Sequence, residues 1–362
     1  MSVPGTVHIK VPTAVSAVSL GPNDVLCVGS DDGSLRWYNL PEGKVCKAVK
    51  SLGEEVSSIV WSRPKKEEPA TVWVASGRKL FSFPADSQKM IMTAEDATCV
   101  LEVGEDNDDV LNEASTAMLC LSDHGKLLAF GSDSGAVGTI DVSSKQISRM
   151  KTRHTTVCGC VKFIPDRPGE LLSGGYDYSL LHFDVGQGNI LSRYDTTAPL
   201  PSDGVSLSPP FVLSISISST GLLAASTADG RVWLGGGGEK RPASSQGGKK
   251  KRSRKWEGLK EEEGRWLQVA EGPVVSTAFR DQKRLLTCSL LGVVSAYEIS
   301  RDAQGTLQAE KMWNARASSL VKVNALAVSN SWVIVGGFGK DGKGIVEAWH
   351  DPLPDVPQES TP

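Results

Sequence analysis

The stretch LAFGSDSGAVGTIDV, residues 128–142, decides the fold class, because it contains a complete strand–turn–strand unit. Leu128 and Phe130 alternate with small residues ahead of the turn, and Val137 and Ile140 follow it. The Gly-Ser-Asp-Ser-Gly sequence between them suits a tight hairpin, since glycine accepts a positive φ and aspartate hydrogen-bonds its own backbone. A single hairpin is marginally stable, so a chain that repeats this unit is expected to stack the copies.

Six further copies of this unit follow the same layout and differ in how far their sequences have diverged. They are LCVGSDDGSLRWYNL (26–40), VWVASGRKLFSFPAD (72–86), LLSGGYDYSLLHFDV (171–185), LAASTADGRVWLG (223–235), LLTCSLLGVVSAYEI (285–299) and VIVGGFGKDGKGIVEAWHD (333–351). An alternating apolar segment precedes each copy, so the repeating units begin near residues 15, 56, 117, 157, 211, 273 and 323. Their starts are separated by roughly 40 to 60 residues, which is the period of propeller blades.

Seven units of about four short strands, with almost no helical periodicity, predict an all-β, seven-bladed β-propeller over residues 6–352. A pair of β-sandwiches is the alternative, because sandwiches also use evenly spaced short strands. The segment TVHIKV (6–11) alternates without a hairpin of its own, and the last unit lacks a trailing strand. We therefore expect residues 6–11 to close the last blade and protect both strand edges. Residues 353–362 are expected to form a disordered tail.

Composition argues for an intracellular, soluble protein. The net charge of −3 over 362 residues gives no global case for binding to nucleic acid or to a membrane. No long apolar run or signal peptide is present, and the seven cysteines include no C-x-x-C pair. Cys158 and Cys160 are too few for a zinc site, so we expect no metal and no cofactor.

A basic insert at 235–264 interrupts the repeats. Its Gly- and Ser-rich first half predicts a flexible tether. Six positive charges then fall within seven residues: Lys249, Lys250, Lys251, Arg252, Arg254 and Lys255. The cluster suits a nuclear localisation signal read by an import receptor. It could instead contact nucleic acid, or be a solvated loop of no specific role, since Glu261–Glu263 follow it.

The sequence offers little for catalysis, and we expect no catalytic residues. Its five histidines are dispersed, and no G-x-S-x-G, H-E-x-x-H or phosphate-loop motif is present. His154 lies ahead of a strand, and Asp177 lies in the following turn. Asp32 and Asp229 occupy the corresponding turn position in other units. An enzyme with an active site in the central channel is the remaining alternative, because residues distant in sequence converge there.

The hairpin ends resemble those of the WD40 repeat family, in which a hairpin finishes on Trp-Asp and a histidine ahead of the blade bonds a turn aspartate. Here the ends include Ile140-Asp141 and Phe183-Asp184, and His154 with Asp177 matches the histidine–aspartate pair. The resemblance implies that His154 and Asp177 fix their blade by hydrogen bonding, and that Asp32 and Asp229 have the corresponding structural role in other units. The stretch 132–185 is also similar to the middle blades of WD40 proteins associated with the cullin-4 ubiquitin ligase through its damaged-DNA-binding adaptor. Such receptors often carry W-D-x-R at a hairpin end, which no repeat has here.

The resemblance implies a protein-interaction scaffold in the nucleus, the cytoplasm or both, with other proteins and an import receptor as partners. A role as substrate receptor or adaptor of a cullin-type ubiquitin ligase is the leading expectation. The alternative is a nuclear protein that contacts RNA or preribosomal particles through the basic cluster.

Overall fold

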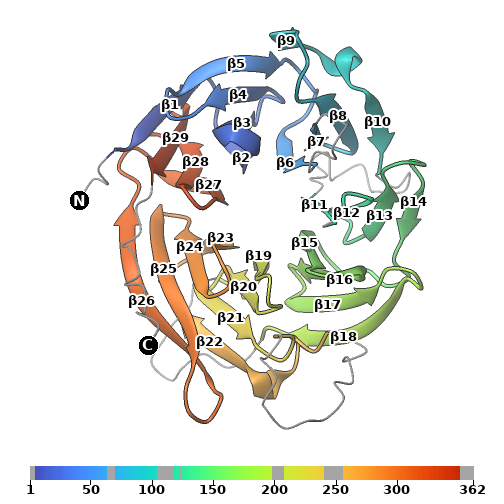
Figure 1. Ribbon diagram of the computed structural model, residues 1–362, viewed down its shortest axis with the longest axis vertical. Helices are drawn as coiled ribbons and strands as arrows, with labels where there is room; N and C mark the ends of the chain where they lie inside the picture. Colours follow the sequence, from blue (N-terminus) through green and yellow to red (C-terminus); the bar gives the residue numbers. More distant parts are fainter. Residues whose placement is uncertain are drawn as a thin grey trace, which may run out of the picture.

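Seven β-sheets are arranged as blades around a central channel in the computed structural model (Figure 1). The structure describes residues 5–62, 70–103, 118–122, 124–197, 208–239 and 256–350. The prediction of an all-β, seven-bladed propeller is confirmed. Blades are numbered 1 to 7 in chain order, from the sheet that begins with β2. Within the described residues, no helix is long and apolar enough to cross a bilayer.

The first strand of each blade lines the channel, and the first strands of neighbouring blades contact one another around the ring. These inner strands are β2 (Val15–Leu20), β6 (Val56–Trp61), β11 (Met118–Leu121), β15 (Cys158–Ile164), β19 (Val212–Ile217), β23 (Val274–Phe279) and β27 (Lys322–Val328).

The two middle strands of each blade form the hairpin that repeats in the sequence. The second strands are β3 (Val25–Ser30), β7 (Thr71–Ser76), β12 (Leu127–Gly131), β16 (Arg167–Gly175), β20 (Leu223–Thr227), β24 (Arg284–Ser289) and β28 (Trp332–Phe338). The third strands are β4 (Leu35–Asn39), β8 (Lys79–Pro84), β13 (Val137–Asp141), β17 (Ser179–Asp184), β21 (Arg231–Gly235), β25 (Val293–Arg301) and β29 (Gly344–His350).

The outer strands follow the third strands along the chain in six blades. They are β5 (Lys44–Val49), β10 (Cys99–Glu102), β14 (Ile147–Arg149), β18 (Asn189–Asp195), β22 (Gly264–Gln268) and β26 (Leu307–Arg316). Short 3-10 turns lie at η1 (Pro22–Asp24), η2 (Ala94–Asp96) and η3 (Glu261–Glu263).

The outer strand of blade 7 comes from the other end of the chain. Strand β1 (Val7–Val11) pairs antiparallel with β29, and Val7 lies opposite Ala348. Ile9 and Val11 of β1 are buried among side chains of blades 7 and 1. The ring is therefore closed by a sheet that contains both the first and the last strand (Figure 1).

Blade 1 has a fifth strand that the sequence analysis did not anticipate. Strand β9 (Ile91–Met92) follows the third strand of blade 2, but it pairs in parallel with β5 of blade 1. The Ala48 and Lys50 amides donate to the carbonyls of Met90 and Met92, both at 2.9 Å. The connection from β8 to β10 thus links two neighbouring blades at the outer rim.

The core is divided among the seven interfaces between blades, with one cluster of buried side chains at each. Trp37 of blade 1 packs with Phe83 of blade 2, for example, and Trp73 of blade 2 packs with Phe130 of blade 3. Because alternate residues of a strand point to opposite faces of its sheet, each blade contributes to the two clusters on either side of it.

The hairpin turn of blade 3 shows why the repeated glycine is needed. Gly135 has a φ of +82°, and a Cβ there would lie 2.2 Å from the His154 carbonyl oxygen. The His154 amide donates to the Gly135 carbonyl at 3.0 Å. Glycine therefore serves both the left-handed backbone and the close approach of the loop that leads into blade 4.

Candidate functional site

His154 and Asp177 lie together in blade 4. The His154 ring is buried, with Nδ1 2.8 Å from Asp177 Oδ1 and Nε2 2.7 Å from Ser173 Oγ. Asp177 also accepts from the Ser179 hydroxyl at 2.8 Å and from the Thr155 amide at 3.0 Å. The five residues join the loop before β15, strand β16 and the β16–β17 turn into one polar cluster.

The hydrogen bonds at Asp177 hold its carboxyl in the charged form. Burial by itself raises the pKa of Asp177, but the bonds from His154, the Thr155 amide and Ser179 outweigh it and set the pKa well below its usual range. The stabilisation is therefore present above the pKa of about 3.9 that an unfolded aspartate has, and it is lost as the pH falls through the lower pKa of the folded state.

We expect Asp177→Ala to lower the free energy of unfolding by about 3 kcal/mol at pH 7, because it removes the carboxylate that bonds the buried His154 ring, the Thr155 amide and the Ser179 hydroxyl. The loss should shrink as the pH falls below about 4, because the unfolded aspartate then takes up a proton while the folded carboxylate stays charged. Asp184→Ala is the matched control, since Asp184 of the same blade accepts one exposed bond from the Gln187 amide. Equal losses for both variants in urea unfolding would contradict a blade-fixing role for Asp177.

Asp32 and Asp229 occupy the corresponding turns of blades 1 and 5, outside this cluster. Asp32 is exposed and accepts from the amide and hydroxyl of Ser34. Asp229 is buried, and the Arg231 guanidinium contacts its Oδ2 through Nε at 2.7 Å and Nη2 at 2.6 Å. The aspartate thus keeps its turn position in all three blades, while its partner changes from histidine to serine or arginine.

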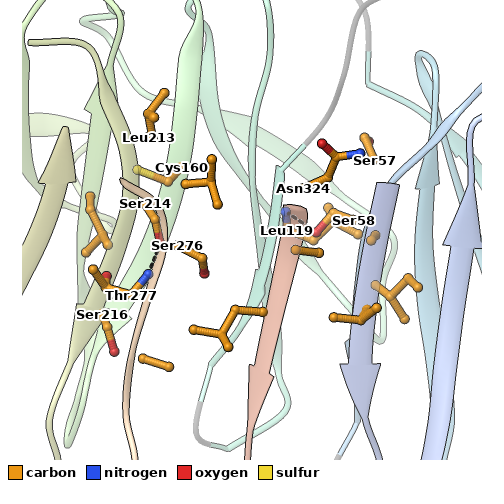
Figure 2. Close-up of a pocket in the computed structure, with 18 of the residues that line it drawn as sticks. Ser57, Ser58, Leu119, Cys160, Leu213, Ser214, Ser216, Ser276, Thr277 and Asn324 are labelled. Carbon is orange, nitrogen blue, oxygen red and sulfur yellow. Dashed lines mark hydrogen bonds between the residues drawn. The ribbon is translucent and has the colours of Figure 1, made fainter. Parts of the chain in front are cut away.

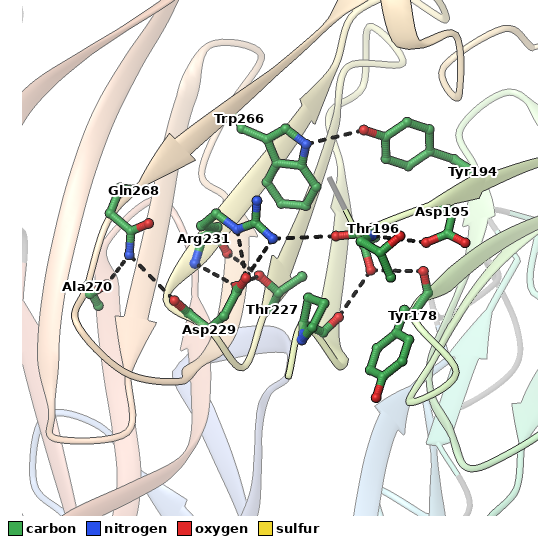
Figure 3. Close-up of polar contacts among 12 residues, drawn as sticks. Tyr178, Tyr194, Asp195, Thr196, Thr227, Asp229, Arg231, Trp266, Gln268 and Ala270 are labelled. Atoms are coloured by element: carbon green, nitrogen blue, oxygen red, sulfur yellow. Dashed lines mark hydrogen bonds and ion pairs between the residues drawn. The ribbon is translucent and has the colours of Figure 1, made fainter. Parts of the chain in front are cut away.

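The Asp229–Arg231 pair belongs to a larger buried cluster at the junction of blades 4 and 5 (Figure 3). Arg231 lies over the Trp266 ring at 4.3 Å from its centroid, and its Nη2 donates to the Thr196 carbonyl at 3.4 Å. Trp266 in turn donates to the Tyr194 hydroxyl at 3.2 Å. These contacts connect the end of blade 4 with the hairpin and outer strand of blade 5.

The six basic residues Lys249, Lys250, Lys251, Arg252, Arg254 and Lys255 lie outside the described residues, so the proposed localisation signal has no structural account. The C-terminal end of the predicted flexible insert needs correction, because residues 256–264 have a defined place in the structure and lead into β22 through η3. Trp256 and Leu259 are buried between blades 4 and 5. The large apolar side chain directly after the basic run was the available signal for this anchor.

Trp256 is fixed at both its backbone and its ring. Its amide donates to Glu170 Oε2 at 3.0 Å, and its indole Nε1 donates to the Gly221 carbonyl at 3.0 Å. Glu170 also contacts His182 Nε2 at 2.9 Å and Arg167 at 2.8 Å. This glutamate, which the sequence did not single out, joins the insert to blade 4.

A cavity of about 300 Å³ lies in the central channel between the inner strands (Figure 2). Hydroxyl and amide groups on its wall bind the neighbouring blade. Ser16 Oγ donates to the Val56 carbonyl at 2.7 Å, and Asn324 Nδ2 donates to the Val15 carbonyl at 2.8 Å. The polar groups of this wall therefore contribute to ring closure.

The channel lining contains aliphatic, hydroxyl and amide side chains together with Lys162 and the Cys160 thiol. Burial raises the pKa of Cys160 to about 12, so the thiol stays protonated and is a poor nucleophile at neutral pH. No aspartate, glutamate or histidine is among the described residues that line the cavity. Nor do the described parts of the chain bring together three metal-ligating side chains.

Six four-stranded blades and one five-stranded blade around the inner-strand channel define a seven-bladed β-propeller. The histidine–aspartate pair of blade 4 resembles the pair found in WD40 repeats. The chain is similar to the WD repeat-containing protein 53 homolog of Dictyostelium discoideum, with 23% identity over 244 residues. The match covers 61% of this chain and spans 61% of the relative's length. No family model matches the sequence.

Proposed function

We propose that this propeller is a protein-interaction scaffold without a catalytic centre of its own. The lining of the channel carries this proposal: its aliphatic and hydroxyl groups, protonated thiol and single lysine suit binding better than acid–base chemistry. The polar clusters around His154, Arg231 and Glu170 are occupied by bonds within and between blades. These bonds hold the blades together in a rigid ring, and the surface of such a ring can present binding sites.

We further propose that the partner set includes a cullin-type ubiquitin ligase, for which the chain would act as substrate receptor or adaptor. The resemblance of residues 132–185 to WD40 proteins of that kind supports this role. The hairpin ends continue as Ile140-Asp141-Val142-Ser143 and Phe183-Asp184-Val185-Gly186, without the W-D-x-R motif. Binding to the adaptor would therefore use a different part of the surface.

A nuclear protein that binds RNA or preribosomal particles is the second candidate. The six charges of 249–255 favour it, because a dense basic run can neutralise several phosphates. The same run supports nuclear import, and the two roles make different predictions.

Affinity purification of the tagged full chain from cells, followed by mass spectrometry, tests these proposals. We expect cullin-4 and its adaptor to be enriched at least tenfold over a tag-only control, with or without nuclease. The variant in which Lys249, Lys250, Lys251, Arg252, Arg254 and Lys255 are all alanine should keep these partners but move from nucleus to cytoplasm. Its thermal unfolding midpoint should equal the wild-type value.

Loss of all partners on nuclease treatment would overturn the ligase role and favour the RNA-associated candidate. An alanine variant that stays fully nuclear would remove the localisation role of the basic run. Absence of any reproducible protein partner would contradict the scaffold proposal itself.

A further inference from the structure

A groove of about 680 Å³ lies at the outer rim where the two ends of the ring meet. Its sides are β1, the outer strand of blade 7, and β4, β5 and β9 of blade 1. A Cβ on Gly43, in the β4–β5 turn, would lie 3.3 Å from Ile9 Cγ1 of β1, so the two blades approach closely at one end. We refer to this feature as the blade 7/1 groove.

The blade 7/1 groove is apolar and open to solvent. Ile9 and Tyr38 are buried in it, whereas Val45, Met90 and Ile91 are 54%, 70% and 59% exposed. These three are among the most exposed large apolar side chains of the described residues. A concentration of exposed apolar side chains with a polar rim is typical of an interaction site, whereas single exposed residues are ordinary.

Positive charge surrounds these apolar side chains. The cationic side chains that line the groove are Lys10, Arg36, Lys47 and Lys50, and the His8 side chain lies beside them. None of the described lining residues is acidic. The Lys10 and Lys50 ammonium groups have no hydrogen-bond or ion-pair partner among the described residues, and both side chains are exposed. The chain as a whole carries a net charge of −3, so the positive charge is a local property of the groove.

We propose that the blade 7/1 groove binds a short acidic segment of a partner protein that carries aliphatic side chains between its carboxylates. The aliphatic groups would cover Val45, Met90 and Ile91, and the carboxylates would meet Lys10 and Lys50 at the rim. This inference rests on the proposed scaffold function and names the chemistry of one partner. Complementary charge of this kind raises the association rate and makes binding sensitive to salt.

The probe is a pool of synthetic 12-residue peptides whose positions are drawn from Asp, Glu, Leu, Val and Ile. Two control pools replace the acids by Lys and Arg, or the aliphatic residues by Ser and Gly. The purified full chain should retain the acidic aliphatic pool at least tenfold over either control. Peptides selected from it should bind about tenfold more weakly at 0.3 M than at 0.05 M salt, because the contacts are exposed to counterions.

Two variants locate the binding in the groove. K10E/K50E should lower the affinity for a selected peptide at least tenfold through lost charge pairing. V45S/I91S should lower it by a similar factor through lost apolar contact. K322E/K340E is the matched control, since both lysines are exposed and lie elsewhere on blade 7. All three variants change exposed side chains, so their thermal unfolding midpoints should match the wild type.

Equal retention of the three pools, or unchanged binding by K10E/K50E, would overturn the proposal. Preferential retention of the basic pool would show that the groove selects cationic peptides, and this result would also overturn the proposal. A concentration-dependent dimer in light scattering that K10E/K50E abolishes would make a second copy the occupant and would also overturn it. If wild type and K10E/K50E retain the same cellular partners equally, the groove proposal fails but the scaffold function stands. If the wild-type chain retains no cellular partner, the scaffold function itself fails.

Discussion

A chain that lacks residues 1–11 should lose about 5 kcal/mol or more of its free energy of unfolding. The deletion removes β1 and with it the buried side chains of Ile9 and Val11, each worth about 1.5–3 kcal/mol. It also exposes the edge of β29 and breaks the closure of the ring between blades 7 and 1. Loss on this scale is comparable to the whole stability of many domains, so the truncated chain should unfold at much lower urea.

Urea unfolding followed by circular dichroism measures this loss. A synthetic peptide of residues 5–12, added in excess, should restore part of the stability, because it can pair with β29 in place of the missing strand. If the truncated chain is insoluble, the same peptide supplied during refolding should recover folded protein. A truncated chain with the wild-type midpoint, unaffected by the peptide, would contradict closure by β1.

Breaking the ion pair of blade 5 should have the second large effect. The Arg231 and Asp229 side chains are 3% and 2% exposed, so removal of one partner leaves the other charge buried and uncompensated. We expect Arg231→Met to lower the free energy of unfolding by about 4 kcal/mol, and Asp229→Leu by a similar amount. The double variant should lose less than the sum of the two, because no unpaired charge remains in the cluster.

A double-mutant cycle measured by urea unfolding tests this coupling. The matched control is Arg284→Met, because the Arg284–Asp281 pair of blade 6 has similar sequence spacing but side chains that are 31% and 37% exposed. An exposed pair contributes little, and its loss should cost about 0.5 kcal/mol. Additive losses for Arg231 and Asp229 would show that the pair acts as two independent residues.

The repeated hairpins could be predicted because their information is local. Alternating apolar residues and a Gly-Asp turn specify β12 and β13 within fifteen residues of sequence, and the same pattern located the other blades. His154 and Asp177 were singled out for a different reason, because they match the histidine–aspartate pair of WD40 repeats, and the structure places the two side chains 2.8 Å apart.

Features that depend on the meeting of distant segments were not predictable. Strand β9 has two residues and pairs in parallel across a blade boundary, so its sequence shows no strand signal. Glu170 and Trp256 are 86 residues apart, and nothing in either segment indicates the other. The blade 7/1 groove likewise exists because ring closure places β1 beside β5 and β9, which the sequence separates.

The closure by β1 also has a consequence for synthesis of the chain. Strand β1 cannot pair until β29 has been synthesised, because Val7 lies opposite Ala348 in the sheet. About 340 residues of chain lie between these two residues. At roughly 5–20 residues per second, the ribosome needs on the order of 20–70 seconds to make that length. During this interval the nascent chain displays the apolar Ile9 and Val11 on an unpaired strand. The last blade can therefore form only after β29 has been synthesised, and until then the open ring exposes apolar strands of the kind that chaperones bind.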